Sequence, residues 1–130
     1  MSINIETTGV NHLALRSTDL PRSKRFYAET LGFPLVLDTE GAFVLLAGNT
    51  VVGVLAPETD TPGGDHFSSS RVGLDHLALA AASDEEIVRV AAALTVAGVP
   101  NTGVKTDAMT GKRYVAFDDP DGIIWELYLA

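Results

Sequence analysis

The sequence predicts an α+β fold made of two βαβββ modules, and an internal repeat is the main observation behind this prediction. The tetrapeptide His12-Leu-Ala-Leu15 recurs as His76-Leu-Ala-Leu79, and Gly32-Phe-Pro34 recurs as Gly98-Val-Pro100. The offsets are 64 and 66 residues, and each copy carries one helix-like segment followed by short apolar runs. A constant order at a near-constant offset indicates a duplicated unit. We expect one domain, with module 1 at residues 8–56, a linker at 57–71 and module 2 at 72–130.

Each module is expected to open with a strand, at residues 10–16 and 73–80. Strand alternation puts His12, Ala14 and Arg16 on one face of the first strand, opposite two leucines. In the second copy, His76 takes the place of His12 and also shares its face with alanines. The repeat therefore places two histidines at equivalent positions.

A helix follows each opening strand. Asp19 is the expected N-cap of the first helix. In the second, Ser83 begins a capping box, in which its side chain binds the amide of Glu86 and the Glu86 carboxylate reaches back. Both helices are expected to end at a left-handed glycine, Gly32 and Gly98.

Three short strands complete each module. They are expected at 34–38, 41–47 and 50–56 in the first module, and at 102–107, 112–118 and 122–129 in the second. Gly48-Asn49 is expected to turn one hairpin, and Asp119-Pro-Asp-Gly122 to turn another. The segment 57–71 is rich in Pro, Gly, Ser and Asp, which is typical of a linker.

Composition excludes several classes of function. The chain has 9 Lys and Arg against 17 Asp and Glu, and a net charge of −8 disfavours nucleic acids and anionic membranes. Cysteine is absent, so neither a disulfide framework nor a thiolate metal site is available. The first residues lack a basic segment before an apolar run, and the apolar stretch 42–56 is too short to span a bilayer. We expect a cytoplasmic protein.

Three residues form a candidate metal site. His12 and His76 are equivalent by the repeat, and Glu126 lies in the apolar segment Ile124-Trp-Glu-Leu-Tyr128. An unpaired carboxylate in an apolar strand is costly, and a metal ion shared with two imidazoles removes that cost. The alternative is a structural ion pair from Glu126 to Arg16 or Arg113.

These segments resemble the vicinal oxygen chelate superfamily, which includes glyoxalase I, bleomycin-resistance proteins, fosfomycin-modifying enzymes and extradiol dioxygenases. The resemblance runs from Val10 to Leu129 and rests on the repeated His-Leu-Ala-Leu, on residues 19–33 and on residues 119–127. It implies paired βαβββ modules around a cleft and a homodimer. It also implies that His12, His76 and Glu126 bind a divalent ion, with Fe(II) favoured and Mn, Ni or Zn as alternatives. The fourth ligand position of glyoxalase I falls near Gly53, which carries no ligand.

The resemblance leaves three functions open. The favoured one is a metal-dependent enzyme on a small oxygen-chelating substrate, with a three-ligand site like that of extradiol dioxygenases. In that interpretation His66 is the acid–base residue and Tyr114 lies near the substrate. The alternatives are a metal-free drug-binding protein and a glyoxalase-like lyase or isomerase.

Overall fold

The computed structural model describes residues 1–130 and confirms the α+β fold with two equivalent sheets. One sheet has the strand order β1-β4-β3-β2, from β1 (His12–Arg16), β2 (Leu35–Asp38), β3 (Ala42–Ala47) and β4 (Thr50–Leu55). The other has the order β5-β8-β7-β6, from β5 (Leu77–Ala81), β6 (Lys105–Thr106), β7 (Arg113–Asp118) and β8 (Ile124–Leu129). In each sheet the opening strand pairs in parallel with the last strand of its module, and the other pairs are antiparallel.

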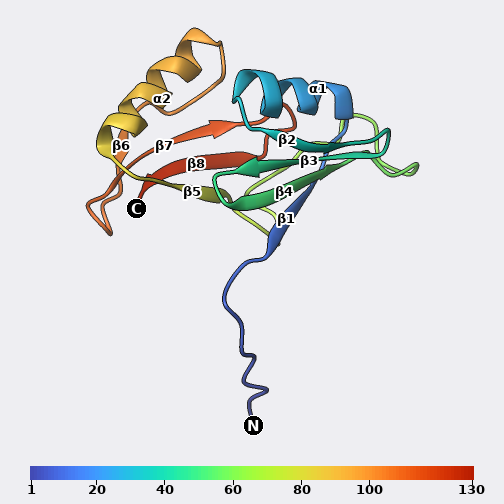
Figure 1. Cartoon of the computed structure of the whole chain (residues 1–130), viewed down its shortest axis with the longest axis horizontal. Helices are drawn as coiled ribbons and strands as arrows, with labels where there is room; N and C mark the ends of the chain where they lie inside the picture. The colour runs from blue at the N-terminus through green and yellow to red at the C-terminus, as the bar shows by residue number, and fades with distance from the viewer.

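The helices cover one face of the two sheets, and the opposite face is left uncovered (Figure 1). α1 (Leu20–Lys24) begins at the predicted cap, where the Asp19 carboxylate accepts a hydrogen bond from the Arg22 amide. It continues as a π-helix, η1 (Arg25–Thr30), which closes with a bond from the Leu31 amide to the carbonyl of Phe26, five residues back. The sequence pattern did not predict this π-helical turn. None of the helices is long and apolar enough to cross a bilayer.

The second helix, α2 (Asp84–Val96), confirms half of the predicted capping box. The Ser83 hydroxyl accepts a hydrogen bond from the Glu86 amide at 3.2 Å. The Glu86 carboxylate does not reach back; it binds the Arg89 guanidinium through two bonds of 2.6 and 2.8 Å. A two-bond charged pair one turn along the helix competes successfully with a single bond to a backbone amide.

All eight predicted strands are shorter in the structure, and the difference is largest for β5 and β6. β5 begins at Leu77 rather than at residue 73, and Gly73 itself adopts a φ of +141°, which is outside the range of a regular strand. His76 therefore directly precedes β5. β6 contains only two residues. The glycines at the helix ends and the Asp119–Gly122 turn have the expected left-handed residues, with Gly122 at a φ of +81°.

A buried contact joins the modules on the helix-covered side. The Tyr27 ring of η1 lies edge-on to Trp125 of β8, with ring centroids 5.8 Å apart, and both side chains are fully buried. The Tyr27 hydroxyl donates to the Asp119 carboxylate at 2.6 Å and accepts from the Trp125 indole N–H at 3.0 Å. Burial, and then the adjacent Asp119 charge, raises the pKa of Tyr27 far above its usual value. Burial also raises the pKa of Asp119.

A second polar contact fixes the same interface. The Asp121 carboxylate accepts hydrogen bonds from the amide and hydroxyl of Thr18 and lies 2.9 Å from the Arg22 guanidinium. Thr18 and Arg22 belong to module 1, whereas Asp121 belongs to the last turn of module 2 and its side chain is only 6% exposed. Buried hydrogen-bonded carboxylates of this kind favour one arrangement. The two modules therefore hold a fixed orientation within the chain.

Candidate functional site

The centre of the candidate site is a contact between His76 and Glu126. β5 and β8 pair in parallel with Ala78 opposite Glu126, which brings the carboxylate beside the residue that precedes β5. The His76 Nε2 atom lies 3.4 Å from the Glu126 Oε1 atom, and the two side chains are 39% and 16% exposed. The alternative ion pairs of Glu126 are not formed, since Arg16 lies 3.5 Å from Glu58 and Arg113 lies 3.8 Å from Asp84.

Both repeated histidines have the same local geometry. The Nδ1 atom of His12 lies 2.7 Å from the Asn11 Oδ1 atom, and the Nδ1 atom of His76 lies 2.7 Å from the Asp75 Oδ1 atom. An imidazole that donates from Nδ1 leaves the Nε2 lone pair available as a ligand. Two such nitrogens and one carboxylate make a donor set that fits a divalent transition-metal ion.

The single chain brings only two of these three donors together. His12 lies at the start of β1 in the other sheet, and no three His, Asp or Glu side chains are grouped as ligands of one ion. The side chains of His12, Ala14 and Arg16 alternate with those of Leu13 and Leu15, and the first three are exposed whereas Leu15 is buried.

The strand registers identify the counterpart of Glu126 in module 1. Ala78 pairs with Glu126 across β5 and β8, and the equivalent Ala14 pairs with Gly53 across β1 and β4. Gly53 therefore occupies the position that Glu126 holds in module 2. A carboxylate side chain is therefore present at this position in module 2 only.

Tyr114 lies on the same sheet face as Glu126, next to a second tyrosine. Its ring stacks on Tyr128 at a centroid separation of 5.8 Å and an interplanar angle of 15°. The Tyr128 hydroxyl donates to the Asp107 carboxylate at 2.9 Å and also bonds the Thr110 hydroxyl. The backbone amide of Met109 and the Tyr128 hydroxyl hold the pKa of Asp107 below its usual value. These hydrogen bonds hold the Tyr128 ring in place, and the Tyr114 ring stacks against it.

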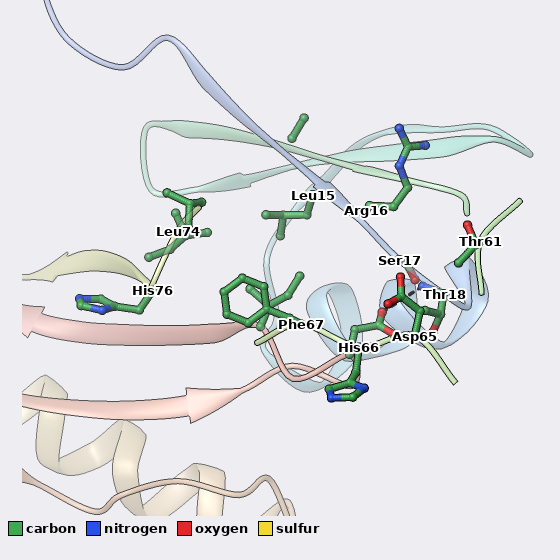
Figure 2. Close-up of a pocket in the computed structure, with 14 residues that line it drawn as sticks. Leu15, Arg16, Ser17, Thr18, Thr61, Asp65, His66, Phe67, Leu74 and His76 are labelled. Carbon is green, nitrogen blue, oxygen red and sulfur yellow. Dashed lines mark hydrogen bonds between the residues drawn. The ribbon is translucent and has the colours of Figure 1, made fainter. Parts of the chain in front are cut away.

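A cavity of about 270 Å³ lies between the modules, beside His76 (Figure 2). Leu15, Phe67 and Leu74 supply apolar surface, and His66 and His76 both line the cavity. Figure 2 shows the two imidazoles on different sides of Phe67 in this view. His66 is exposed, and its Nδ1 atom lies 3.3 Å from the Gly64 carbonyl oxygen. Tyr114 does not line this cavity.

Several residues of this region were not singled out from the sequence. Asn11 and Asp75 contact the histidines, Tyr128 supports Tyr114, and Phe67 lines the cavity. The repeat held a signal for the first two, because an oxygen-bearing side chain precedes the histidine in both copies. No comparable local signal marks Tyr128 or Phe67, whose positions depend on strand pairing and on the path of the linker.

Comparisons with known proteins agree with this architecture. A family model described as the Glyoxalase/Bleomycin resistance protein/Dioxygenase superfamily matches residues 9–127. Two relatives are 32% identical over 130 residues, the "uncharacterized protein YwkD" of Bacillus subtilis (strain 168) and the "uncharacterized protein YaeR" of Escherichia coli (strain K12). In both cases the alignment covers 92% of this chain and 94% of the relative.

The fold is also similar to that of solved structures. A glyoxylase/bleomycin resistance protein/dioxygenase domain from Frankia sp. EAN1pec superposes with a TM-score of 0.81 at 26% identity. That alignment covers 96% of this chain and 99% of the Frankia domain. The match extends over both modules, so the relative has the same duplicated architecture.

Proposed function

Because the chain belongs to the glyoxalase/bleomycin resistance protein/dioxygenase superfamily, we propose that it is a divalent-metal-dependent enzyme acting on a small substrate that chelates the ion through oxygen atoms. The proposed ligands are His12, His76 and Glu126. The observation that carries the proposal is the pair of equivalent imidazoles, each with its Nδ1 atom 2.7 Å from a side-chain oxygen. The Nε2 atom of His76 also lies 3.4 Å from the largely buried Glu126 carboxylate.

The number of protein ligands favours one reaction class among those of the superfamily. Gly53 leaves the fourth position without a donor, which counts against a glyoxalase-like lyase. A set of two histidines and one carboxylate leaves positions open for a bidentate substrate and for dioxygen. We propose Fe(II) as the resident ion and an extradiol-type ring cleavage as the reaction. The stacked Tyr114 and Tyr128 rings beside Glu126 favour a flat substrate.

We propose that two chains complete the site. The contacts of Tyr27 and Asp121 fix the modules in an arrangement that separates His12 from the His76–Glu126 pair. A second chain that faces its module 1 toward this module 2 would supply the missing histidine.

The extent of exposed surface supports this assembly. A 13.7 kDa monomer is expected to expose about 6,600 Å², whereas this chain exposes 8466 Å². Part of the excess comes from the segment 1–10, which extends away from the sheets (Figure 1), and part from the uncovered sheet faces. A stable homodimer would cover both.

In this proposal the chain's own residues bind the substrate and handle its proton. A bound divalent ion would hold two adjacent substrate oxygens and lower the pKa of a substrate hydroxyl. His66 would accept that proton at Nε2, because its Nδ1 atom faces the Gly64 carbonyl. The Tyr114 hydroxyl would donate a hydrogen bond to a substrate oxygen, with its ring held by Tyr128. The apolar residues Leu15, Phe67 and Leu74 would limit the access of water on the side of the site next to His76.

Metal analysis tests the proposal directly. Protein purified without chelator, or reloaded anaerobically with Fe(II), should hold about one ion per pair of histidines. The variants His76→Ala and Glu126→Gln should lose it while keeping the wild-type circular dichroism spectrum. If the wild type binds Fe, Mn, Ni and Zn no better than a variant lacking all three ligands, the enzyme proposal fails and the metal-free drug-binding alternative replaces it. A panel of catechols with the Fe(II)-loaded protein then tests ring cleavage by absorbance.

A further inference from the structure

We propose that Asn11 and Asp75 are positioning residues that preset the two imidazoles, and that the carboxylate of Asp75 makes His76 the stronger of the two ligands. This inference builds on the proposed metal site. It assigns a role to two exposed side chains that make no other hydrogen bond or ion pair.

The geometry of the two contacts is the same although the modules differ in sequence. Each histidine has its Nδ1 atom 2.7 Å from a side-chain oxygen of the residue before it. Consecutive side chains on a regular strand point to opposite faces, so such a contact is not expected within an extended strand. It forms because both pairs lie at the start of a strand, where His12 begins β1 and His76 precedes β5. The duplicated fold has kept this junction in both copies.

The chemistry of the two acceptors is different. An ionised carboxylate can only accept a hydrogen bond, so Asp75 requires a proton on the Nδ1 atom of His76, and the neutral ring that meets this requirement has its lone pair at Nε2. The Nε2 atom of His76 is the one that faces Glu126 at 3.4 Å. An amide can either accept from an Nδ1 proton or, after a flip, donate to an unprotonated Nδ1. Asn11 therefore steadies the His12 ring without dictating which nitrogen carries the proton.

The two halves of the site contribute differently to metal binding. His76 is held in the ligating tautomer next to a carboxylate on its own chain, whereas His12 must select that tautomer when the ion binds. A carboxylate partner also increases the ligand strength of an imidazole. The pair of His76 and Glu126 is therefore the preformed half of the site, and His12 completes it.

Because Asp75 is exposed, its proposed positioning role can be tested separately from any contribution to folding. The Asp75 side chain is 72% exposed, and an exposed charged pair contributes little to stability. Replacement of Asp75 should therefore leave the fold intact and change only the state of the neighbouring imidazole. Asp60→Asn is a suitable control, because it removes one negative charge from an exposed loop position that does not line the cavity.

Long-range ¹H–¹⁵N NMR of the metal-free protein at about pH 8, where an ordinary histidine is neutral, tests the tautomers directly. The Nδ1 atom of His76 should be protonated in the wild type and in Asp60→Asn, whereas in Asp75→Ala the proton should shift toward Nε2, which faces the Glu126 carboxylate. In Asn11→Asp, His12 should carry a proton on Nδ1, as His76 does in the wild type. If the His76 tautomer is the same in the wild type and in Asp75→Ala, the proposal is wrong.

Competition with a chelator for Co²⁺ gives the second measurement. Asp75→Ala should weaken Co²⁺ binding by about 10- to 100-fold, and Asp75→Asn should recover part of the loss because it keeps an acceptor oxygen. Asn11→Ala should cost less than Asp75→Ala. Equal losses at the two positions would contradict the asymmetry. If the wild type binds no Co²⁺, the proposed function fails, whereas the tautomer measurement still decides the role of Asp75.

Discussion

Mixing two defective variants would establish whether two chains share the metal site. The variants are His12→Ala and His76→Ala, each of which should lack one ligand at every site of its own homodimer. If the site joins module 1 of one chain to module 2 of its partner, a heterodimer of the two variants contains one site without either histidine. Its other site contains the intact His12 of one chain and the intact His76 and Glu126 of the other.

The size of the recovery follows from this geometry. The fixed contact of Tyr27 with Trp125 and Asp119 keeps His12 and His76 in separate sheets of each chain. Random reassociation of equal amounts gives about one half heterodimers, so about one quarter of all sites should regain three ligands. Neither variant alone should have any such site.

The assay is titration of the mixed protein with Co²⁺, followed by its visible absorption, after the two variants have been coexpressed or unfolded and refolded together. Size-exclusion chromatography confirms that dimers have formed, and a mixture made without subunit exchange serves as the control. An exchanged mixture that binds Co²⁺ only as the average of its parents would refute the shared site, because a site within one chain cannot be repaired by a partner.

Three further predictions concern single positions. Gly53→Glu should strengthen Zn²⁺ binding about tenfold or more in a competition with a chelator, because the new side chain takes the position equivalent to that of Glu126. There is room for it, since a Cβ atom at this position meets only the Leu13 carbonyl oxygen, at 3.8 Å. An unchanged Zn²⁺ affinity would mean that the metal site lies elsewhere. Tyr27→Phe should lower the free energy of unfolding by about 1–3 kcal/mol in urea titrations, since it leaves two buried groups without their partner; a cost near zero would mean that this contact does not fix the modules. The raised pKa of Tyr27 means that the unfolded chain releases this proton first, so the stability of the wild type should fall as the pH rises above about 10. The free energy of unfolding of Tyr27→Phe should fall less steeply with pH in this range. If the two proteins lose stability equally steeply above about pH 10, the raised pKa of Tyr27 is contradicted.

The sequence predicted the fold well because its signals are local. The Asp19 cap, the Gly98 helix end and the Asp119–Gly122 turn each depend on a few neighbouring residues, and all three are present. The errors are also local. β5 begins four residues later than predicted, and Glu86 binds Arg89 rather than the helix start.

The relation between the modules could not be predicted in the same way. It depends on contacts such as Tyr27 with Asp119 and Thr18 with Asp121, which join residues 92 and 103 positions apart. Read from its sequence neighbours alone, each of these residues is accounted for as part of a helix or a turn, so its long-range contact leaves no local signal. Only the folded chain shows that together they set the two sheets side by side and thereby separate His12 from His76.

This separation gives the asymmetry of the modules a physical interpretation. Duplication supplies two equivalent strand pairs, yet the proposed carboxylate ligand is present only as Glu126, with Gly53 in its place in module 1. The acceptor behind the histidine also differs, as Asp75 in one copy and Asn11 in the other. Because of both differences, the carboxylates Asp75 and Glu126 lie beside the histidine of module 2, whereas His12 of module 1 has only the uncharged Asn11 and Gly53 at the corresponding positions. In a site shared between chains, such a division lets one module hold an ion before assembly and lets the other complete its coordination. Metal binding and dimerisation should then stabilise each other.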